Sequence, residues 1–368
     1  MTESSQRLTV RGRPPAGFRG EAGAYLMADA AVPGAAAGQP VIEVSGLEKR
    51  YGRKEVLRGV SFSVRQGEVF CLLGPNGVGK TTTIEILEGF RAATAGTARV
   101  LGLDPSAQEL RARIGVVLQE CGFPRHMKVG ELLTAWRMYY PRSLPQADLL
   151  EVVELTAEEG SLVRRLSGGQ RRRLDFALAL AGDPDLIFLD EPTTGFDPEA
   201  RRRCWIVIEN LRSMGKTIIL TTHYLDEAER LADRVAILAA GRVAQLGAPR
   251  ELAIRSGAPT TISFAAPAAL RRGDVALPGH LRPARQGGPG PLPHGDLRAE
   301  ITSDDPWTDV RALLDWAERN RLGPLADFSV APPSLEEAYL YQFGAERLSG
   351  RPAAAETEDT EGREVPDE

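Results

Sequence analysis

The chain has 368 residues, enough for one large domain and one small one, and its formal net charge of −5 argues against a basic surface for nucleic acid. Its three cysteines, Cys71, Cys121 and Cys204, form no CxxC pair, which is typical of a reduced cytosolic protein without a zinc site. No stretch approaches the roughly 18 apolar residues that a transmembrane helix needs, so we expect membrane contact only through a partner.

The first forty residues are rich in Ala, Gly, Pro and Arg and show no periodicity. This composition predicts a disordered N-terminal extension over residues 1–40. Its arginines suggest a basic targeting region, but no apolar segment follows them. The alternative is that translation starts at Met27, and the intact mass of the native protein would decide between the two.

A phosphate-binding loop is predicted after the first buried strand. Residues 68–73 are apolar without alternation, which indicates a parallel strand, and they lead into GPNGVGKT at Gly74 to Thr81. Glycines leave room for backbone N–H groups to converge on a phosphate. Lys80 supplies positive charge for the outer phosphates, and the Thr81 hydroxyl can ligate Mg²⁺. A helix over 82–88 would add the partial positive charge of its N-terminus.

Two acids follow a second apolar strand, Leu186 to Leu189. At such a strand end, Asp190 can hold Mg²⁺ and Glu191 can polarise an attacking water. Solvated carboxylates at an ordinary turn are the alternative interpretation. The phosphate loop upstream favours the catalytic interpretation.

Together with LSGGQ at Leu166 to Gln170, these motifs resemble the nucleotide-binding subunits of ATP-binding cassette (ABC) transporters, over roughly residues 41–253. The resemblance implies an α/β fold: a P-loop NTPase cassette with a mixed core sheet, an antiparallel β part and a helical subdomain at about 122–165. It also implies an ATPase that uses ATP and Mg²⁺ and couples hydrolysis to transport.

The resemblance assigns roles to individual positions. It implies catalytic roles for Glu191, His223 and Gln119, and Mg²⁺ ligation by Thr81, Gln119 and Asp190. The nucleotide would be bound by an aromatic side chain, which stacks on adenine, and by the phosphate loop. These residues are Tyr51, Gly74, Pro75, Asn76, Gly77, Val78, Gly79, Lys80, Thr81 and Thr82. The LSGGQ signature motif and the D-loop, which contains Asp197, would contact the nucleotide of a partner subunit. These residues are Ser167, Gly168, Gly169, Gln170 and Asp197.

The signature motif implies a dimer. Ser167 and two glycines before a helix make a second anion-binding N-terminus, besides the one in the phosphate loop. In the family this terminus faces the γ-phosphate bound by the other subunit. A plainer local role is helix capping, by Ser167 and by Asp197 before Pro198, and the two roles are compatible.

The resemblance also implies partners and location. We expect a homodimer or a cassette heterodimer, an integral membrane permease, no nucleic acid, and a peripheral position at the cytoplasmic face of the cell membrane. The permease helix would enter a groove beside Gln119. Four large side chains line either that groove or the core of the helical subdomain, whose helices are predicted at 129–140 and 147–156: Met127, Trp136, Met138 and Tyr139.

Residues about 255–345 predict a small α+β domain after the cassette. Alternation and helical spacing place strands at 260–264, 297–302 and 328–331, and a helix at 306–322. A capping box at Ser334 opens a last helix. The composition of 349–368 predicts an acidic disordered tail.

The segment PSLEEAY, Pro333 to Tyr339, resembles the C-terminal end of the bacterial daunorubicin-resistance branch of drug and antibiotic exporters. It implies export of a drug-like or antibiotic small molecule, hence a role in antibiotic resistance, and contact of this domain with the dimer or the permease. An importer subunit, or a soluble ABC ATPase acting in translation or DNA repair, stays open as an alternative.

Overall fold

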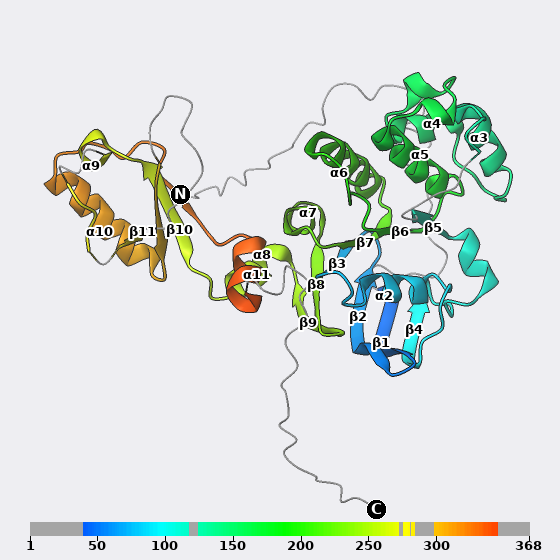
Figure 1. Cartoon of the computed structure of the whole chain (residues 1–368), viewed down its shortest axis with the longest axis horizontal. Coiled ribbons are helices and arrows are strands. Elements are labelled where there is room, and N and C mark those ends of the chain that lie inside the picture. The colour runs from blue at the N-terminus through cyan, green and yellow to red at the C-terminus, as the bar shows by residue number, and fades with distance from the viewer. Residues whose placement is uncertain (1–39, 118–123, 272–274, 280, 284–297, 345–368) are drawn as a thin grey trace, which may run out of the picture.

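The computed structural model describes residues 40–117, 124–271, 275–279, 281–283 and 298–344. In this part of the chain the strands form three sheets. A large N-terminal body holds two of them, and a smaller body with the third is joined to it by two chain segments (Figure 1). Among the described helices, none is long and apolar enough to cross a membrane.

The central sheet of the large body has the order β5-β6-β7-β3-β8-β9. Its strands are β3 (Val69–Leu73), β5 (Ile114–Val117), β6 (Leu186–Asp190), β7 (Thr217–Thr222), β8 (Arg234–Ala239) and β9 (Arg242–Gly247). The first five in spatial order pair in parallel, and β9 joins antiparallel. Because the carboxyl ends of parallel strands share an edge, the loops after β3, β6 and β7 meet there.

Alternate residues of β3 face two different hydrophobic clusters. Val69, Cys71 and Leu73 face the helices α5 (Gly168–Leu180), α6 (Pro198–Ser213) and α7 (Leu225–Leu231). Phe70 and Leu72 face α2 (Lys80–Leu87) and an antiparallel sheet in the order β2-β1-β4. That sheet comprises β1 (Pro40–Tyr51), β2 (Lys54–Arg65) and β4 (Ala95–Val100), and the short helix η1 (Gln108–Ala112) precedes β5. A strand buried on both faces explains the continuous apolar run in the sequence.

The described residues between β5 and α5, from 124 onward, form a helical region, as the sequence predicts, with shorter helices. It contains α3 (Val129–Arg137), α4 (Gln146–Val152), η2 (Thr156–Glu158) and η3 (Val163–Arg165). Of the four large side chains in question, Met127 and Trp136 pack against the core, whereas Met138 and Tyr139 are 82% and 80% exposed. The four therefore divide between core and surface.

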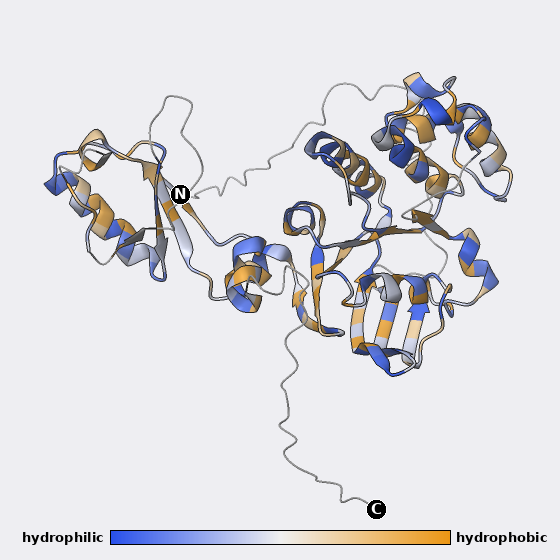
Figure 2. Cartoon of the chain, viewed as in Figure 1, coloured by the Kyte–Doolittle hydropathy of each residue, from blue (hydrophilic) through white to orange (hydrophobic). Residues whose placement is uncertain are grey.

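The smaller body has a βαββαβ chain order. It comprises β10 (Thr260–Ala265), α9 (Ala268–Arg271), β11 (Arg282–Pro283), β12 (Arg298–Ser303), α10 (Pro306–Arg319) and β13 (Ser329–Ala331). The sheet order β11-β12-β10-β13, with every pair antiparallel, is that of a ferredoxin-like unit. Polar and apolar residues alternate along α10 (Figure 2), and its apolar residues Leu313 and Trp316 cover Ile262 and Phe264 of the sheet.

The last helix, α11 (Leu335–Phe343), packs on the large body. The sequence prediction grouped it with the domain at 255–345, but in the structure it contacts α7 and α8 (Pro249–Arg255). Leu335 and Tyr339 are 1% and 4% exposed and belong to the cluster of the central sheet. The ferredoxin-like unit is thus inserted between two helices that both pack on the cassette (Figure 1).

The two bodies have separate cores, so they are expected to unfold separately. Phe264 is fully buried in the smaller core. We predict that Phe264→Ala destabilises the ferredoxin-like unit by about 3–5 kcal/mol, because it leaves a cavity. Hydrogen exchange read by mass spectrometry should quicken in β10 and β12 and stay unchanged in β3 and β6. Phe328→Ala, at a side chain 37% exposed, is the control. Equal quickening in β3 would contradict separate cores.

Candidate functional site

The phosphate loop connects β3 to α2, and its glycines serve different needs. Gly79 is the N-cap of α2 with φ of 112°, and a Cβ there would lie 2.5 Å from Leu57 Cδ2. A Cβ on Gly74 would lie 2.7 Å from the carbonyl oxygen of Leu238. Gly74 therefore allows the loop to pack on β8, a role that the sequence analysis did not assign.

The backbone of this loop wraps around the Lys80 side chain. Its side chain is 3% exposed, and Nζ donates hydrogen bonds to the carbonyl oxygens of Gly74 at 2.8 Å and Pro75 at 3.2 Å. The same nitrogen lies 3.1 Å from Glu191 Oε1. A buried ammonium with carbonyl and carboxylate partners is satisfied within the protein, and phosphate oxygens could replace the carboxylate.

Thr221 of β7 organises the two acids at the end of β6. Its hydroxyl donates to Asp190 Oδ1 and accepts from the backbone N–H of Glu191, at 2.9 Å in the latter case. Glu191 has φ of 44°, a left-handed conformation that costs a non-glycine residue about 1–3 kcal/mol and concentrates at functional sites. The sequence analysis did not single out Thr221. The sequence could have indicated this role, because Thr221 lies two residues before His223, at the end of a strand next to β6.

Glu191 and His223, to which the resemblance assigns catalytic roles, lie close together. His223 Nδ1 lies 3.3 Å from Glu191 Oε2 without forming a hydrogen bond, and that oxygen accepts one from the Thr194 hydroxyl at 3.0 Å. Burial raises the pKa of the Glu191 carboxyl, but Lys80, Thr194 and His223 more than offset this effect, so the pKa lies below its usual range. The carboxylate is therefore ionised at neutral pH and can accept a proton from water.

A cavity of about 640 Å³ opens in front of this group. The Tyr51 ring is 40% exposed at its rim, with the cations of Lys49 and Arg91 at 5.3 and 5.2 Å from the ring centroid. Its lining includes eight residues assigned from the sequence: Tyr51, Asn76, Gly77, Gly79, Lys80, Thr81, Thr82 and Glu191. Gly74, Pro75, Val78, Asp190 and His223 adjoin it through the loop and strand ends, and Gln119 lies outside the described residues.

Ser167 caps α5 through a capping box. Its hydroxyl accepts from the backbone N–H of Gln170 at 3.2 Å, and Gln170 Oε1 accepts from the backbone N–H of Ser167 at 2.9 Å. A Cβ added to Gly168 would meet nothing within 4 Å. The packing of this chain therefore does not require glycine at 168, and the space above the helix N-terminus is open to an external group.

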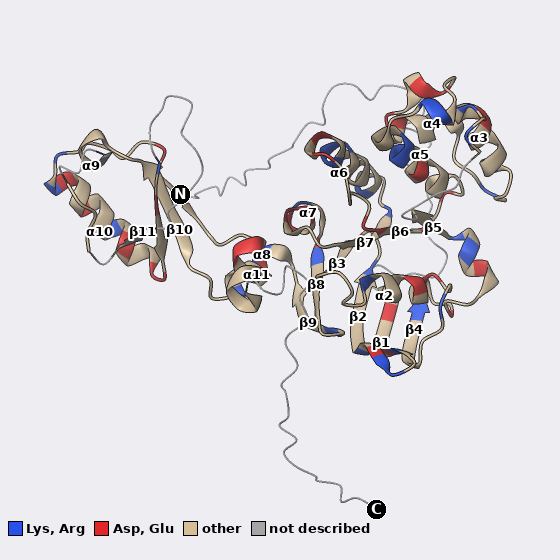
Figure 3. Ribbon diagram, viewed as in Figure 1, with Lys and Arg blue, Asp and Glu red and all other residues tan. Residues whose placement is uncertain are grey.

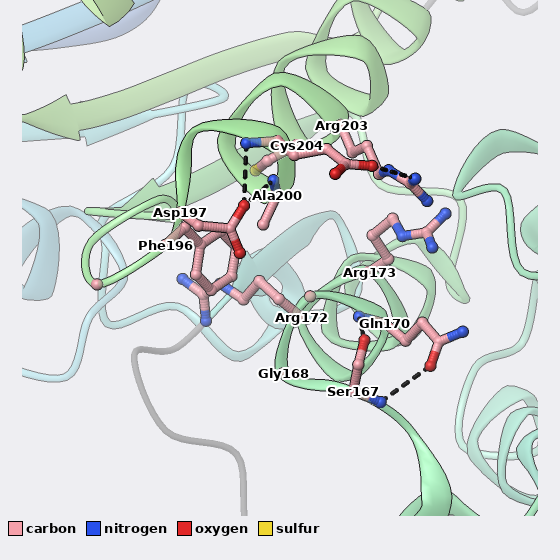
Figure 4. A pocket seen from close by; sticks show the side chains of 13 residues that line it. Ser167, Gly168, Gln170, Arg172, Arg173, Phe196, Asp197, Ala200, Arg203 and Cys204 are labelled. Atoms are coloured by element: carbon pink, nitrogen blue, oxygen red, sulfur yellow. Dashed lines mark hydrogen bonds and ion pairs between the residues drawn. The ribbon is translucent and has the colours of Figure 1, made fainter.

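A second cavity, of about 540 Å³, lies between the N-termini of α5 and α6 (Figure 4). Asp197 caps α6 by accepting from the backbone N–H groups of Glu199 and Ala200, both at 2.9 Å. Basic residues occur along α5 and α6 (Figure 3), and Arg172, Arg173 and Arg203 of these helices line the cavity. The five predicted partner-contact residues all line this cavity: Ser167, Gly168, Gly169, Gln170 and Asp197. The two cavities share no lining residue among those described.

Sequence comparison finds the family profile described as ABC transporter at residues 57–194. The Nod factor export ATP-binding protein I of Ralstonia nicotianae is 45% identical over 222 residues, which cover 58% of this chain and 68% of that protein. The protein of the same name from Paraburkholderia xenovorans is 44% identical over 221 residues, covering 58% of this chain and 73% of that protein.

Solved structures show the same cassette fold. The structure of cbiO1 from Clostridium perfringens, part of the ABC transporter complex cbiONQ, superposes with a TM-score of 0.53 at 27% identity, covering 58% of this chain and 90% of that one. The structure of an ATP binding subunit of an ABC transporter gives a TM-score of 0.52 at 28% identity, covering 59% and 93%. These comparisons confirm the predicted P-loop cassette fold.

Proposed function

Because the chain belongs to the ATP-binding subunits of ABC transporters and is the ATPase of such a transporter, we propose that two copies of its cassette close around two ATP molecules and drive a separate membrane permease. The observation that carries the dimer is the separation of the two cavities, which share no lining residue in the described chain. Because no described residue lines both cavities, we do not expect one anion to contact the phosphate loop and the α5 N-terminus of the same chain, and we assign the anion at that N-terminus to a second subunit.

Individual residues of this chain have different roles in the hydrolysis. Lys80 leaves Glu191 to bind the outer phosphates, which offer it more negative charge than one carboxylate. Glu191, freed from Lys80, orients the attacking water and takes its proton. His223, whose Nδ1 lies 3.3 Å from Glu191 Oε2, orients that carboxylate toward the attacking water and contacts the γ-phosphate. Tyr51 stacks on the adenine at the cavity rim.

Mg²⁺ fits the donors around the acids. Asp190 offers a partly exposed carboxylate at the end of β6, and Thr81 offers an exposed hydroxyl in the first turn of α2. Hard oxygen donors of this type suit the ion, and Gln119 is the third residue that we assign to it. Bound there, the ion would neutralise negative charge on the β- and γ-phosphates.

We further propose that the transporter exports a small amphipathic molecule, drug-like or antibiotic in character, from the cytoplasmic face of the cell membrane. Support for export comes from the relatives named as Nod factor export ATP-binding proteins and from the C-terminal PSLEEAY segment. The cassette itself does not contact the exported molecule, so the permease determines the substrate.

Affinity purification of the tagged chain from detergent-solubilised native membranes, read by mass spectrometry, tests the partner. A polytopic membrane protein in stoichiometric amount is expected. Inverted vesicles that contain the pair should then accumulate the exported molecule with ATP. Recovery of ribosomal or DNA-repair proteins alone, or uptake in the import direction, would overturn the proposal.

Replacing Ser167 separates its capping role from its proposed contact with the partner's ATP. Asp is as good an N-cap as Ser, so Ser167→Asp should leave the free energy of unfolding within about 1 kcal/mol of the wild type. In the Glu191→Gln background, where ATP-bound dimers should accumulate, the added negative charge should repel the partner's γ-phosphate and abolish dimerisation with ATP. Thermal unfolding and light scattering after gel filtration measure the two effects.

The matched control is Ser334→Asp, because Ser334 caps α11 with the same type of capping box, away from both cavities. In the same Glu191→Gln background it should leave ATP-dependent dimerisation unchanged. If Ser167→Asp in the Glu191→Gln background still dimerises with ATP, the γ-phosphate does not face Ser167.

A further inference from the structure

The helix α11 packs against α7, the helix that follows His223. α7 begins at Leu225, two residues after His223, and α11 contacts both α7 and α8. Leu335 and Tyr339 are buried in one cluster with the buried α7 residues Leu225 and Ala228. The backbone N–H of Leu335 also donates to the Glu229 carboxylate of α7, at 3.4 Å.

The opposite side of α7 is attached to the catalytic loops. Glu227, which is fully buried, accepts hydrogen bonds at Oε1 from the Thr193 hydroxyl at 2.9 Å and from Trp205 Nε1 at 3.0 Å. Thr193 lies two residues after Glu191, and Trp205 lies on α6, the helix that Asp197 caps. A displacement of α7 would therefore shift the position of His223, at the end of β7, and of the loop that carries Glu191.

We propose that α11 is a positioning element of the ATPase site: it holds α7 against the cassette, so that His223 stays within reach of Glu191. The proposal rests on the hydrolytic roles proposed above. Because the ferredoxin-like unit is inserted between α8 and α11, a force on that unit would reach His223 through this contact. Binding of the unit by a partner would then change the hydrolysis rate.

Two tyrosines of α11 provide a matched pair for the test. Tyr339 is 4% exposed against the cassette, whereas Tyr341 on the same helix is 63% exposed. In the full chain, Tyr339→Ala should lower kcat for ATP on the order of tenfold and leave KM nearly unchanged, because a small displacement of a reacting group slows chemistry more than it weakens binding. Tyr341→Ala should change neither constant.

A double-mutant cycle separates positioning from general destabilisation. If α11 acts through His223, adding Tyr339→Ala to His223→Ala should cause no further loss of single-turnover rate. Glu229→Ala, which removes the acceptor of the Leu335 N–H at an exposed position, should give a smaller loss of kcat of the same kind and should likewise add nothing to His223→Ala.

Full additivity of Tyr339→Ala and His223→Ala would overturn the proposal, and so would an unchanged kcat in both Tyr339→Ala and Glu229→Ala. Failure of the hydrolytic assignment itself gives a different result. In that case His223→Ala alone would hydrolyse ATP at the wild-type rate, whatever the effect of Tyr339→Ala.

Discussion

Lys80→Ala is expected to lower kcat/KM for ATP hydrolysis by roughly 10²- to 10³-fold, the loss that follows removal of a single group that stabilises developing charge. Lys80 Nζ holds together the carbonyl oxygens of Gly74 and Pro75 and the Glu191 carboxylate. Without it the loop loses its positive charge at the outer phosphates. Steady-state phosphate release and binding of a fluorescent ATP analogue measure the change.

Lys54→Ala is the control for this prediction. Lys54 lines the same cavity but is exposed, so solvent screens its charge, and the variant should stay within about tenfold of the wild-type kcat/KM. Wild-type hydrolysis by Lys80→Ala would show that the loop from Gly74 to Thr81 is not the catalytic phosphate site.

Glu191→Gln should slow hydrolysis by roughly 10²- to 10⁴-fold, the contribution of a positioned general base, while ATP binding is retained. The amide can still accept from the Thr194 hydroxyl, and the backbone N–H still donates to Thr221. The ion pair with Lys80 is lost, which leaves the ammonium available to phosphate. Binding should be as tight as in the wild type or tighter.

The same variant tests the dimer. With ATP bound and hydrolysis slowed, the γ-phosphate stays in place and closed pairs should accumulate. Gel filtration of Glu191→Gln with ATP should give a dimer-sized peak, and Glu209→Gln, in a surface pair with Arg230, should not. A persistent monomer at high ATP and protein concentration contradicts the dimer, and an unreduced rate contradicts the role of Glu191.

Much of the site could be predicted because its motifs lie where strands end. The residues after β3, β6 and β7 are adjacent in space once the sheet is parallel, and continuous apolar runs indicate such a sheet. The predicted caps at Ser167, Asp197 and Ser334 are present for the same local reason: a side-chain oxygen satisfies N–H groups two or three residues further on. Roles that depend on a distant strand were missed, as with Gly74 against Leu238 and Thr221 between the two acids.

The sequence by itself determined the cassette, the order of its motifs and the two glycine-containing helix N-termini that we assign to anions, because each depends on residues close together along the chain. Only the tertiary structure decided three things: that the two cavities are separate, that the appended strands take a ferredoxin-like order, and that α11 returns to α7. These depend on which apolar faces meet across the fold. Helical spacing reveals that Leu335 and Tyr339 share a face, but it does not say which of two hydrophobic cores will bury that face.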